Sequence, residues 1–215
     1  MADIARMADD MVTATKGKDT SMIGAAFDGL ISMPVTMGYL AYDFLDTDTR
    51  YERDTDKIRL MFLIKNGYAN KETLYKILTI IISYYLSQLS EEQREQVYIN
   101  ALVKEGGKIA SNTIVLGQMN AALVSGLVRR ILFGVTFSTI LTLGADQARA
   151  VYTSRRLMAS NPTLYWKLRT AGDLDLLYFL VKDFSKPFED AILLKGQDED
   201  AFNRLIDIYL KKLAE

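Results

Sequence analysis

Two neighbouring stretches without a charged residue constrain this sequence more than any other feature. The first runs from 109 to 128 and the second from 131 to 145, with only Arg129 and Arg130 between them. At about 1.5 Å per residue, a helix over the first stretch spans about 30 Å, the thickness of a bilayer's hydrocarbon core, whereas the second reaches about 22 Å. The pair therefore predicts an apolar helical hairpin over 109–145.

Small and polar residues recur inside both stretches. A ridge of small side chains lets another helix backbone approach closely, which is how helices associate in lipid. Polar amides and hydroxyls in an apolar helix cost free energy unless they meet one another, a protein partner or water. They are therefore expected to face a partner helix, a protein core or an aqueous pore. The predicted helix-packing residues are Gly117, Ala121 and Ser125, which are four residues apart in the first stretch, and Gly134 in the second.

Basic residues flank the hairpin on both sides. Residues 104–170 hold nine basic and two acidic groups, and the segments before and after this block are neutral or acidic. Each basic group near an anionic membrane surface contributes about 1 kcal/mol of attraction. The residues predicted to meet a membrane surface are Lys104, Lys108, Arg149, Arg155 and Arg156.

Outside the hairpin, the sequence has the helix-start signals of an all-α protein. Asn70 can cap a helix whose apolar residues recur at i, i+3, i+4 and i+7, and Ser90 and Gln93 form a capping box. Pro162 follows Asn161 at a first helical position. No stretch alternates apolar and polar residues for long enough to indicate a sheet. We expect one all-α domain over 1–215, a single bundle of about eight to ten helices around the buried hairpin 109–145.

The absence of His and Cys excludes several chemistries. Without these residues there is no zinc site of the usual kind, no Ser-His-Asp or Cys-His nucleophile, and no disulfide framework. The acidic stretch 46–56 lacks the spacing of a calcium loop and is predicted to be a solvated connection. Asp173 and Asp175 with Lys182 are interpreted as ordinary helix-end charges. We therefore expect no enzymatic activity, no metal and no cofactor.

The hairpin also permits a second interpretation. A central helix of a globular bundle is likewise apolar on all sides, so 109–145 can be the core of a soluble interaction protein, such as an adaptor, a chaperone or an immunity partner. Arg129 and Arg130 favour this alternative, because each costs about 2.5 to 3.5 kcal/mol at the centre of a bilayer. Nucleic-acid binding is not expected, because forty largely apolar residues separate the charges of the basic block.

The first ten residues lack the basic start and apolar segment of a secretory signal peptide. We expect a protein that is cytoplasmic in the cell that makes it and that leaves, if at all, by a leaderless route.

A leaderless helical protein that hides an apolar hairpin resembles the small ion-conducting toxins that bacteria export by type VI secretion, and more loosely the pore-forming domains of colicins. The resemblance covers 109–145, although the Arg129-Arg130 pair departs from the nearly uncharged tip of a colicin-type hairpin. It implies a toxin that leaks small cations across a target cell's inner membrane and is neutralised by a cognate immunity protein. Assembly of a homo-oligomer in that membrane is a separate expectation. The resemblance carries over no role for a particular residue. The candidates for lining a conducting path are polar residues of the two stretches: Asn112, Gln118, Asn120, Thr136, Ser138 and Thr142.

Overall fold

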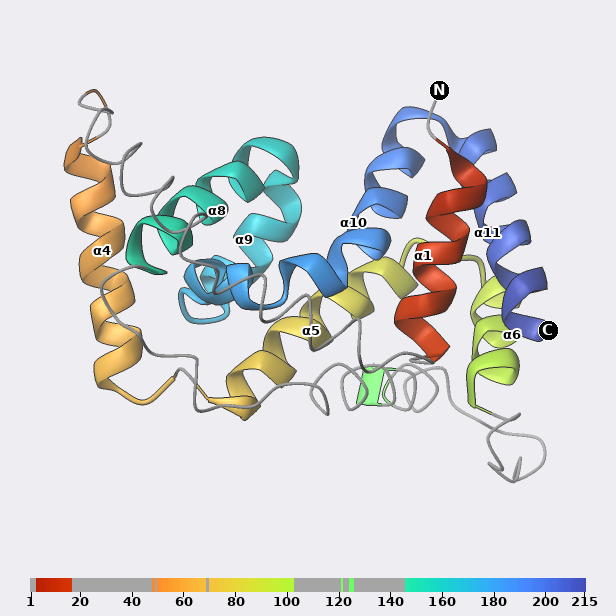
Figure 1. Cartoon of the computed structure of the whole chain (residues 1–215), viewed down its shortest axis with the longest axis horizontal. Coiled ribbons are helices and arrows are strands. Elements are labelled where there is room, and N and C mark those ends of the chain that lie inside the picture. The colour runs from red at the N-terminus through yellow and green to blue at the C-terminus, as the bar shows by residue number, and fades with distance from the viewer. Residues whose placement is uncertain are drawn as a thin grey trace. The chain divides into compact units, whose positions relative to one another are not determined.

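The computed structural model describes residues 3–16, 48, 50–68, 70–102, 121, 124–125 and 146–215. Of these residues 88% are helical and none lies in a strand, which confirms the all-α class (Figure 1). The helices belong to two compact units, called unit 1 and unit 2 here.

Unit 1 is built around the C-terminal helix. That helix, α11 (Glu199–Ala214), contacts α1 (Ile4–Lys16) and α6 (Glu91–Leu102), and Figure 1 shows the three helices side by side. The unit also holds the end of α5 (Lys71–Leu86) and nearly all of α10 (Lys182–Gln197). Its core includes Tyr85 and Phe188, whose ring centroids are 5.1 Å apart.

A buried hydroxyl pair joins the first and last helices of unit 1. The Thr15 hydroxyl oxygen lies 2.8 Å from the Tyr209 hydroxyl oxygen and donates to the Met11 carbonyl at 2.7 Å. Because Thr15 has one hydroxyl proton and the carbonyl receives it, Tyr209 is the donor in the pair. Segments 194 residues apart in sequence are thus connected by a satisfied polar contact.

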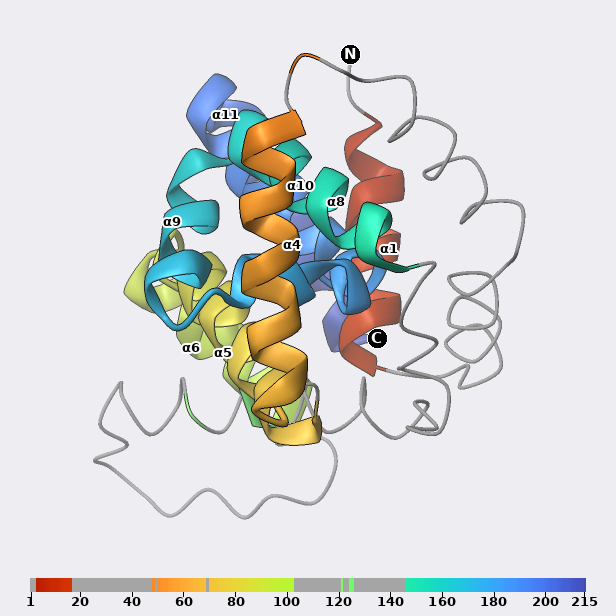
Figure 2. The same ribbon diagram turned by 90° about the vertical axis from the view of Figure 1, so that its left-hand side faces the viewer.

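Unit 2 contains α4 (Arg50–Lys65), the start of α5, α8 (Asp146–Ser160), α9 (Pro162–Thr170) and the 3-10 helix η3 (Leu174–Leu180). All seven residues of η3 are buried. Helix α8 packs against α9 and η3, and α4 contacts α8 and η3, so that α4 presents one long side to the rest of its unit (Figure 2).

Side-chain caps set the helix starts where the sequence predicts them. The Asn70 side chain accepts from the Thr73 backbone N–H at 2.8 Å, and the Asn161 side chain accepts from the Leu164 N–H at 3.1 Å. Each bond satisfies a backbone donor that the first helical turn leaves without a partner. The predicted capping box is also confirmed: the Ser90 N–H donates to Gln93 at 3.0 Å, and the Gln93 N–H donates to Ser90 at 3.2 Å.

The prediction of a solvated connection over 46–56 is wrong in its second half. Helix α4 begins at Arg50, and one of its sides is buried through Arg53, Leu60 and Leu63. Charged residues dominate the first two turns, so their local pattern resembles a loop. Burial of one side against α8 and η3 decides in favour of a helix.

Most of the hairpin lies outside the described residues, and its structure stays a prediction, as does a single domain over 1–215. Within 109–145 the structure describes Ala121, Val124 and Ser125, all helical. Val124 is only 3% exposed, Ser125 is half-buried and Ala121 is exposed. Among the helices within the described ranges, none combines the length and the apolar composition that crossing a membrane requires.

Candidate functional site

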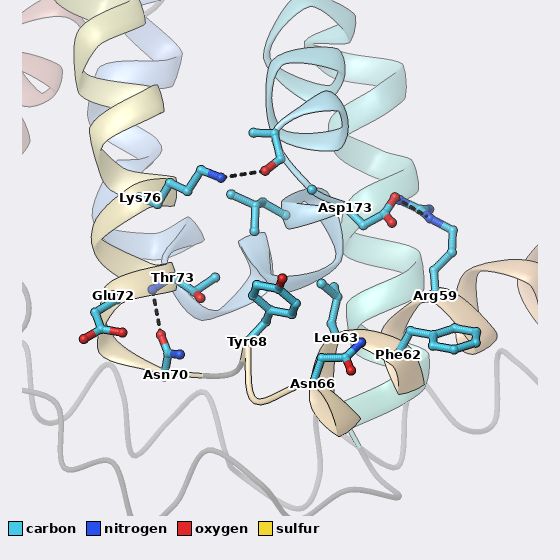
Figure 3. Close-up of a pocket in the computed structure, with 13 residues that line it drawn as sticks. Arg59, Phe62, Leu63, Asn66, Tyr68, Asn70, Glu72, Thr73, Lys76 and Asp173 are labelled. Atoms are coloured by element: carbon cyan, nitrogen blue, oxygen red, sulfur yellow. Dashed lines mark hydrogen bonds and ion pairs between the residues drawn. The ribbon is translucent and has the colours of Figure 1, made fainter.

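A cavity in unit 2 adjoins the densest ion network of the described residues. It has a volume of about 480 Å³, within the range of small-molecule pockets. Its walls come from the end of α4, the turn into α5, the first turns of α5 and the turn between α9 and η3 (Figure 3). The Tyr68 side chain points into the space between α5 and the Asp173–Arg59 pair.

The α4–α5 turn that forms the cavity floor has a defined backbone geometry. Gly67 has a φ of 72°, its N–H donates to the Ile64 carbonyl, and the Tyr68 N–H donates to the Leu63 carbonyl. These two bonds make a Schellman motif, which needs a left-handed residue after the helix. Asn70 then donates to the Gly67 carbonyl at 2.8 Å, so the turn that carries Tyr68 is connected to both helices.

The opposite wall is the turn between α9 and η3. Gly172 has a φ of 118°, and the next residue, Asp173, is left-handed with a φ of 58°. Asp tolerates this conformation better than most residues with a side chain. Lys76 of α5 donates to the Ala171 carbonyl at 2.7 Å, which connects the two walls across the cavity (Figure 3).

Arg59 lies at the centre of the ion network. Its Nη2 atom is 2.6 Å from Asp173 Oδ1 and 2.7 Å from Asp175 Oδ1, and its Nη1 atom is 2.7 Å from Asp56 Oδ1. Nε of the same guanidinium donates to Asp173 at 2.8 Å. One part-buried cation thus holds carboxylates from α4, the α9–η3 turn and η3.

Helix α8 joins this network at two points. The Ser154 hydroxyl donates to Asp175 Oδ2 at 2.6 Å, and Arg155 Nη2 lies 3.1 Å from Asp56 Oδ2. Arg155 also contacts Glu52 at 3.1 Å. The network therefore ties α4, α8 and η3 together with charge-assisted hydrogen bonds, which are stronger than neutral ones.

Burial shifts the pKa values at the centre of the network. Burial raises the pKa of the Asp175 carboxyl, and the hydrogen bond from Ser154 and the charge of Arg59 oppose this rise without cancelling it. Burial by itself lowers the pKa of the Arg59 guanidinium. The charge of Asp175 and hydrogen bonds to Asp173 and Asp56 raise this pKa by more, so the net shift is upward.

The arrangement suits binding and structural support better than catalysis. Ser154 and Asp175 form a hydroxyl–carboxylate pair, but they are 2% and 0% exposed, so no substrate reaches the Ser154 oxygen. The lining of the cavity includes two cations, Arg59 and Lys76, and two carboxylates, Glu72 and Asp173. Among the described residues, no group of three or more acidic side chains has the arrangement of a metal site.

The residues predicted from the sequence lie elsewhere, and most are outside the described part of the chain. This holds for two of the predicted membrane-surface residues, Lys104 and Lys108, and for Gly117 and Gly134 of the packing set. It also holds for all the predicted pore-lining residues: Asn112, Gln118, Asn120, Thr136, Ser138 and Thr142.

The structure places the three described membrane-surface candidates in different environments. Arg149 is 7% exposed with its guanidinium 5.7 Å from the centroid of the Phe179 ring, and Arg155 is held by the ion network. Among the three, only Arg156 is exposed. In this folded form Arg149 does not lie on the surface, because it packs in the core between α8 and η3. A role at a membrane stays a prediction for all five residues.

The sequence contained part of the signal for the network. Asp173 and Asp175 stand out as a charged pair after a glycine, but pairing them with Lys182 misses the partner that the structure shows. That partner, Arg59, is 114 residues from Asp173, and sequence spacing carries no information about such a contact.

Comparison with protein-family models, with curated proteins and with solved structures yields no match to this chain. Functional statements about it therefore rest on its own residues.

Proposed function

We propose that this protein is a pore-forming antibacterial toxin that inserts the hairpin 109–145 into the inner membrane of a target cell and leaks small cations. The observation that carries the proposal is the pair of uncharged stretches, one of them of bilayer length, between basic flanks. We further propose that it acts as a homo-oligomer in the membrane and that a cognate immunity protein restrains it in the producing cell.

The described residues support this proposal in two ways. The chain is all-α, as a helical pore-former must be before and after insertion. Val124 of the first stretch is 3% exposed, so the folded form shields at least this position from water. Moving apolar side chains from a protein interior into lipid changes their free energy little, so a small bias is enough to release the hairpin.

The test is release of potassium and of a large dye from anionic liposomes after addition of the purified full chain. We expect potassium release without dye release, because a path lined by amides and hydroxyls between close helices is narrow. A variant with Gly117→Leu and Gly134→Leu should fold as the wild type does and release less potassium, because the added side chains hold the helices apart.

Gly196→Leu is the matched control, because nothing lies within 4 Å of a Cβ placed at Gly196. It should release potassium at the wild-type rate. Equal release by the wild type and the double glycine variant would remove 109–145 from the conducting path. Absence of both binding and release would refute the proposal.

Absence of membrane activity would favour the second candidate, a soluble interaction protein with 109–145 as its core. The specific observation for it is the distribution of exposed apolar side chains. Nine large hydrophobic side chains of the described residues are exposed, and eight belong to unit 2. Four of the eight, Tyr51, Ile58, Met61 and Phe62, lie on α4, and a contiguous exposed apolar patch is typical of a surface that binds another protein.

A further inference from the structure

One side of α4 is exposed along its whole length and carries four large apolar side chains. Tyr51 is 86% exposed, Ile58 54%, Met61 62% and Phe62 60%. At 100° per residue these positions fall on the side of the helix opposite Arg53, Leu60 and Leu63, the residues that α4 buries in unit 2. Figure 2 shows this helix along its length. We call this side the α4 outer face; its seven residues, all exposed, are Tyr51, Asp54, Thr55, Ile58, Met61, Phe62 and Lys65.

The outer face has the spacing of a helix–helix seam. Tyr51, Ile58 and Lys65 are seven residues apart and take the a positions of a heptad, while Asp54 and Met61 take the d positions. Core packing of unit 2 does not require this pattern, because the opposite side of α4 supplies the buried residues. Such a seam has apolar residues at its centre and a charge toward each end. It fits another helix that places an opposite charge at each of these ends.

The charges indicate which helix that is. In a parallel pair of two α4 helices, Lys65 would face Lys65 and Asp54 would face Asp54, which is repulsive at both ends. In an antiparallel pair, each a position faces a d position of the other helix. Lys65 of each copy then faces Asp54 of the other, and Ile58 faces Met61, so every favourable contact occurs twice under twofold symmetry.

We propose that the α4 outer face is the interface of a homodimer in which the α4 helices of two copies pair antiparallel. Asp54 lies 3.7 Å from Lys57 and its side chain is 59% exposed, so this weak surface pair leaves Asp54 able to meet a partner. An anionic bilayer fits the face less well. Its two charged residues, Asp54 and Lys65, are opposite in sign, so the face carries no net charge that would attract it to anionic headgroups.

The first test is sedimentation equilibrium of the full chain over a range of concentrations. We expect a monomer–dimer equilibrium. Asp54→Lys and Lys65→Asp should each weaken dimerisation about tenfold or more, because each places like charges opposite one another twice. The variant with both substitutions should regain dimerisation. Residues 54 and 65 are three turns apart within one helix, so this recovery requires contact between two copies.

Glu95→Lys is the matched control, since Glu95 is exposed on α6 of unit 1 and the change in charge equals that of Asp54→Lys. It should dimerise as the wild type does. Thermal unfolding of every variant separates loss of dimer from loss of fold. A wild type that stays monomeric at all concentrations would overturn the proposal, and so would a double variant that fails to recover.

A second test uses the absence of native cysteine. In the antiparallel pair, residue 54 of one copy is adjacent to residue 65 of the other, while the two copies of residue 54 are about 16 Å apart. Mixing an Asp54→Cys protein with a Lys65→Cys protein should therefore give a disulfide-linked dimer under mild oxidation, and neither protein alone should do so. Rapid cross-linking of the Asp54→Cys protein with itself would show a parallel pair and overturn the proposal.

A Phe62→Glu variant distinguishes a second copy of the chain from a membrane as the occupant of the α4 outer face. Its dimerisation and its binding to anionic vesicles are both measured. Loss of dimer with unchanged vesicle binding supports the proposal. Loss of vesicle binding with no dimer in the wild type overturns it and assigns the face to the membrane.

Discussion

Replacement of Arg59 by Met tests whether the ion network holds α4 against α8 and η3 within unit 2. The substitution keeps a long side chain of similar volume but removes the cation that contacts Asp56, Asp173 and Asp175 at 2.6 to 2.7 Å. The Arg59 side chain is 12% exposed and that of Asp175 is 0% exposed. The variant therefore leaves a fully buried carboxylate without the positive charge that it faces in the wild type.

The expected cost follows from that uncompensated charge. Removing one partner of a buried ion pair lowers the free energy of unfolding by about 3 to 5 kcal/mol. At a urea dependence of about 2 kcal/mol per molar, the unfolding midpoint should fall by about 2 M. Ser154 still donates to Asp175 and offsets part of the loss, which favours the lower end of the range. Lys186→Met is the control. It removes a cation from an exposed pair with Asp190 and should cost below about 1 kcal/mol.

The deficit of the Arg59 variant should depend on pH. Burial already raises the pKa of the Asp175 carboxyl, and loss of Arg59 removes a contribution that lowers it. A carboxyl whose pKa is higher in the folded than in the unfolded state costs stability when it is ionised, and protonation removes this cost. The difference between the wild type and the variant should therefore be largest at neutral pH and shrink as the pH falls toward the ordinary carboxyl range.

Urea unfolding followed by far-UV circular dichroism at neutral and mildly acidic pH measures both effects. Combining Arg59→Met with Asp175→Asn should recover part of the lost stability, because the second change removes the uncompensated charge. A deficit below about 1 kcal/mol, or one that is the same at both pH values, would refute the assignment of the network as a buried electrostatic support.

Two further substitutions test local contacts, and thermal or urea unfolding measures both. Asn161→Ala removes the cap of α9 and should lower the free energy of unfolding by about 1 kcal/mol. Asn161→Asp should retain the cap and the stability. Equal loss of stability in both variants would show that the cap is not the cause. Tyr209→Phe removes the hydroxyl that donates to Thr15 and should lower the free energy of unfolding by about 1 kcal/mol. The loss is limited because Thr15 keeps its bond to the Met11 carbonyl. An unchanged free energy of unfolding would show that the hydroxyl pair adds no stability.

Local signals predicted the helix starts well. The side chains of Asn70, Ser90 and Asn161 accept from backbone N–H groups only three residues away, so their role as helix caps can be predicted from the sequence. The apolar residues at helical spacing after Asn70 likewise predicted a buried side of α5, and two of them, Leu74 and Tyr85, are 2% and 1% exposed. Such features depend on the chain immediately around them, and tertiary packing reinforces them.

Helix α4 shows where this reasoning fails. Its first turns are rich in charge and resemble a solvated connection, yet Arg53 is 1% exposed and Asp56 belongs to the ion network. The burial of Arg53 against Tyr152 of α8 does not follow from neighbouring residues. Asp56 pairs with Arg59 three residues along α4, but its second partner, Arg155, comes from α8. The sequence also did not predict the outer face of α4, because apolar residues occur on both sides of this helix and form no single stripe.

By itself, the sequence determined the all-α class, the capped helix starts and the existence of an uncharged pair of stretches at 109–145. These follow from composition and from contacts within about four residues along the chain. Only the tertiary structure decided that Arg59 meets Asp173 and Asp175, that Arg149 is buried against Phe179, and that a cavity lies between α4, α5 and the α9–η3 turn. These depend on pairs of residues at least 30 positions apart in the sequence, brought together by packing that no local pattern records.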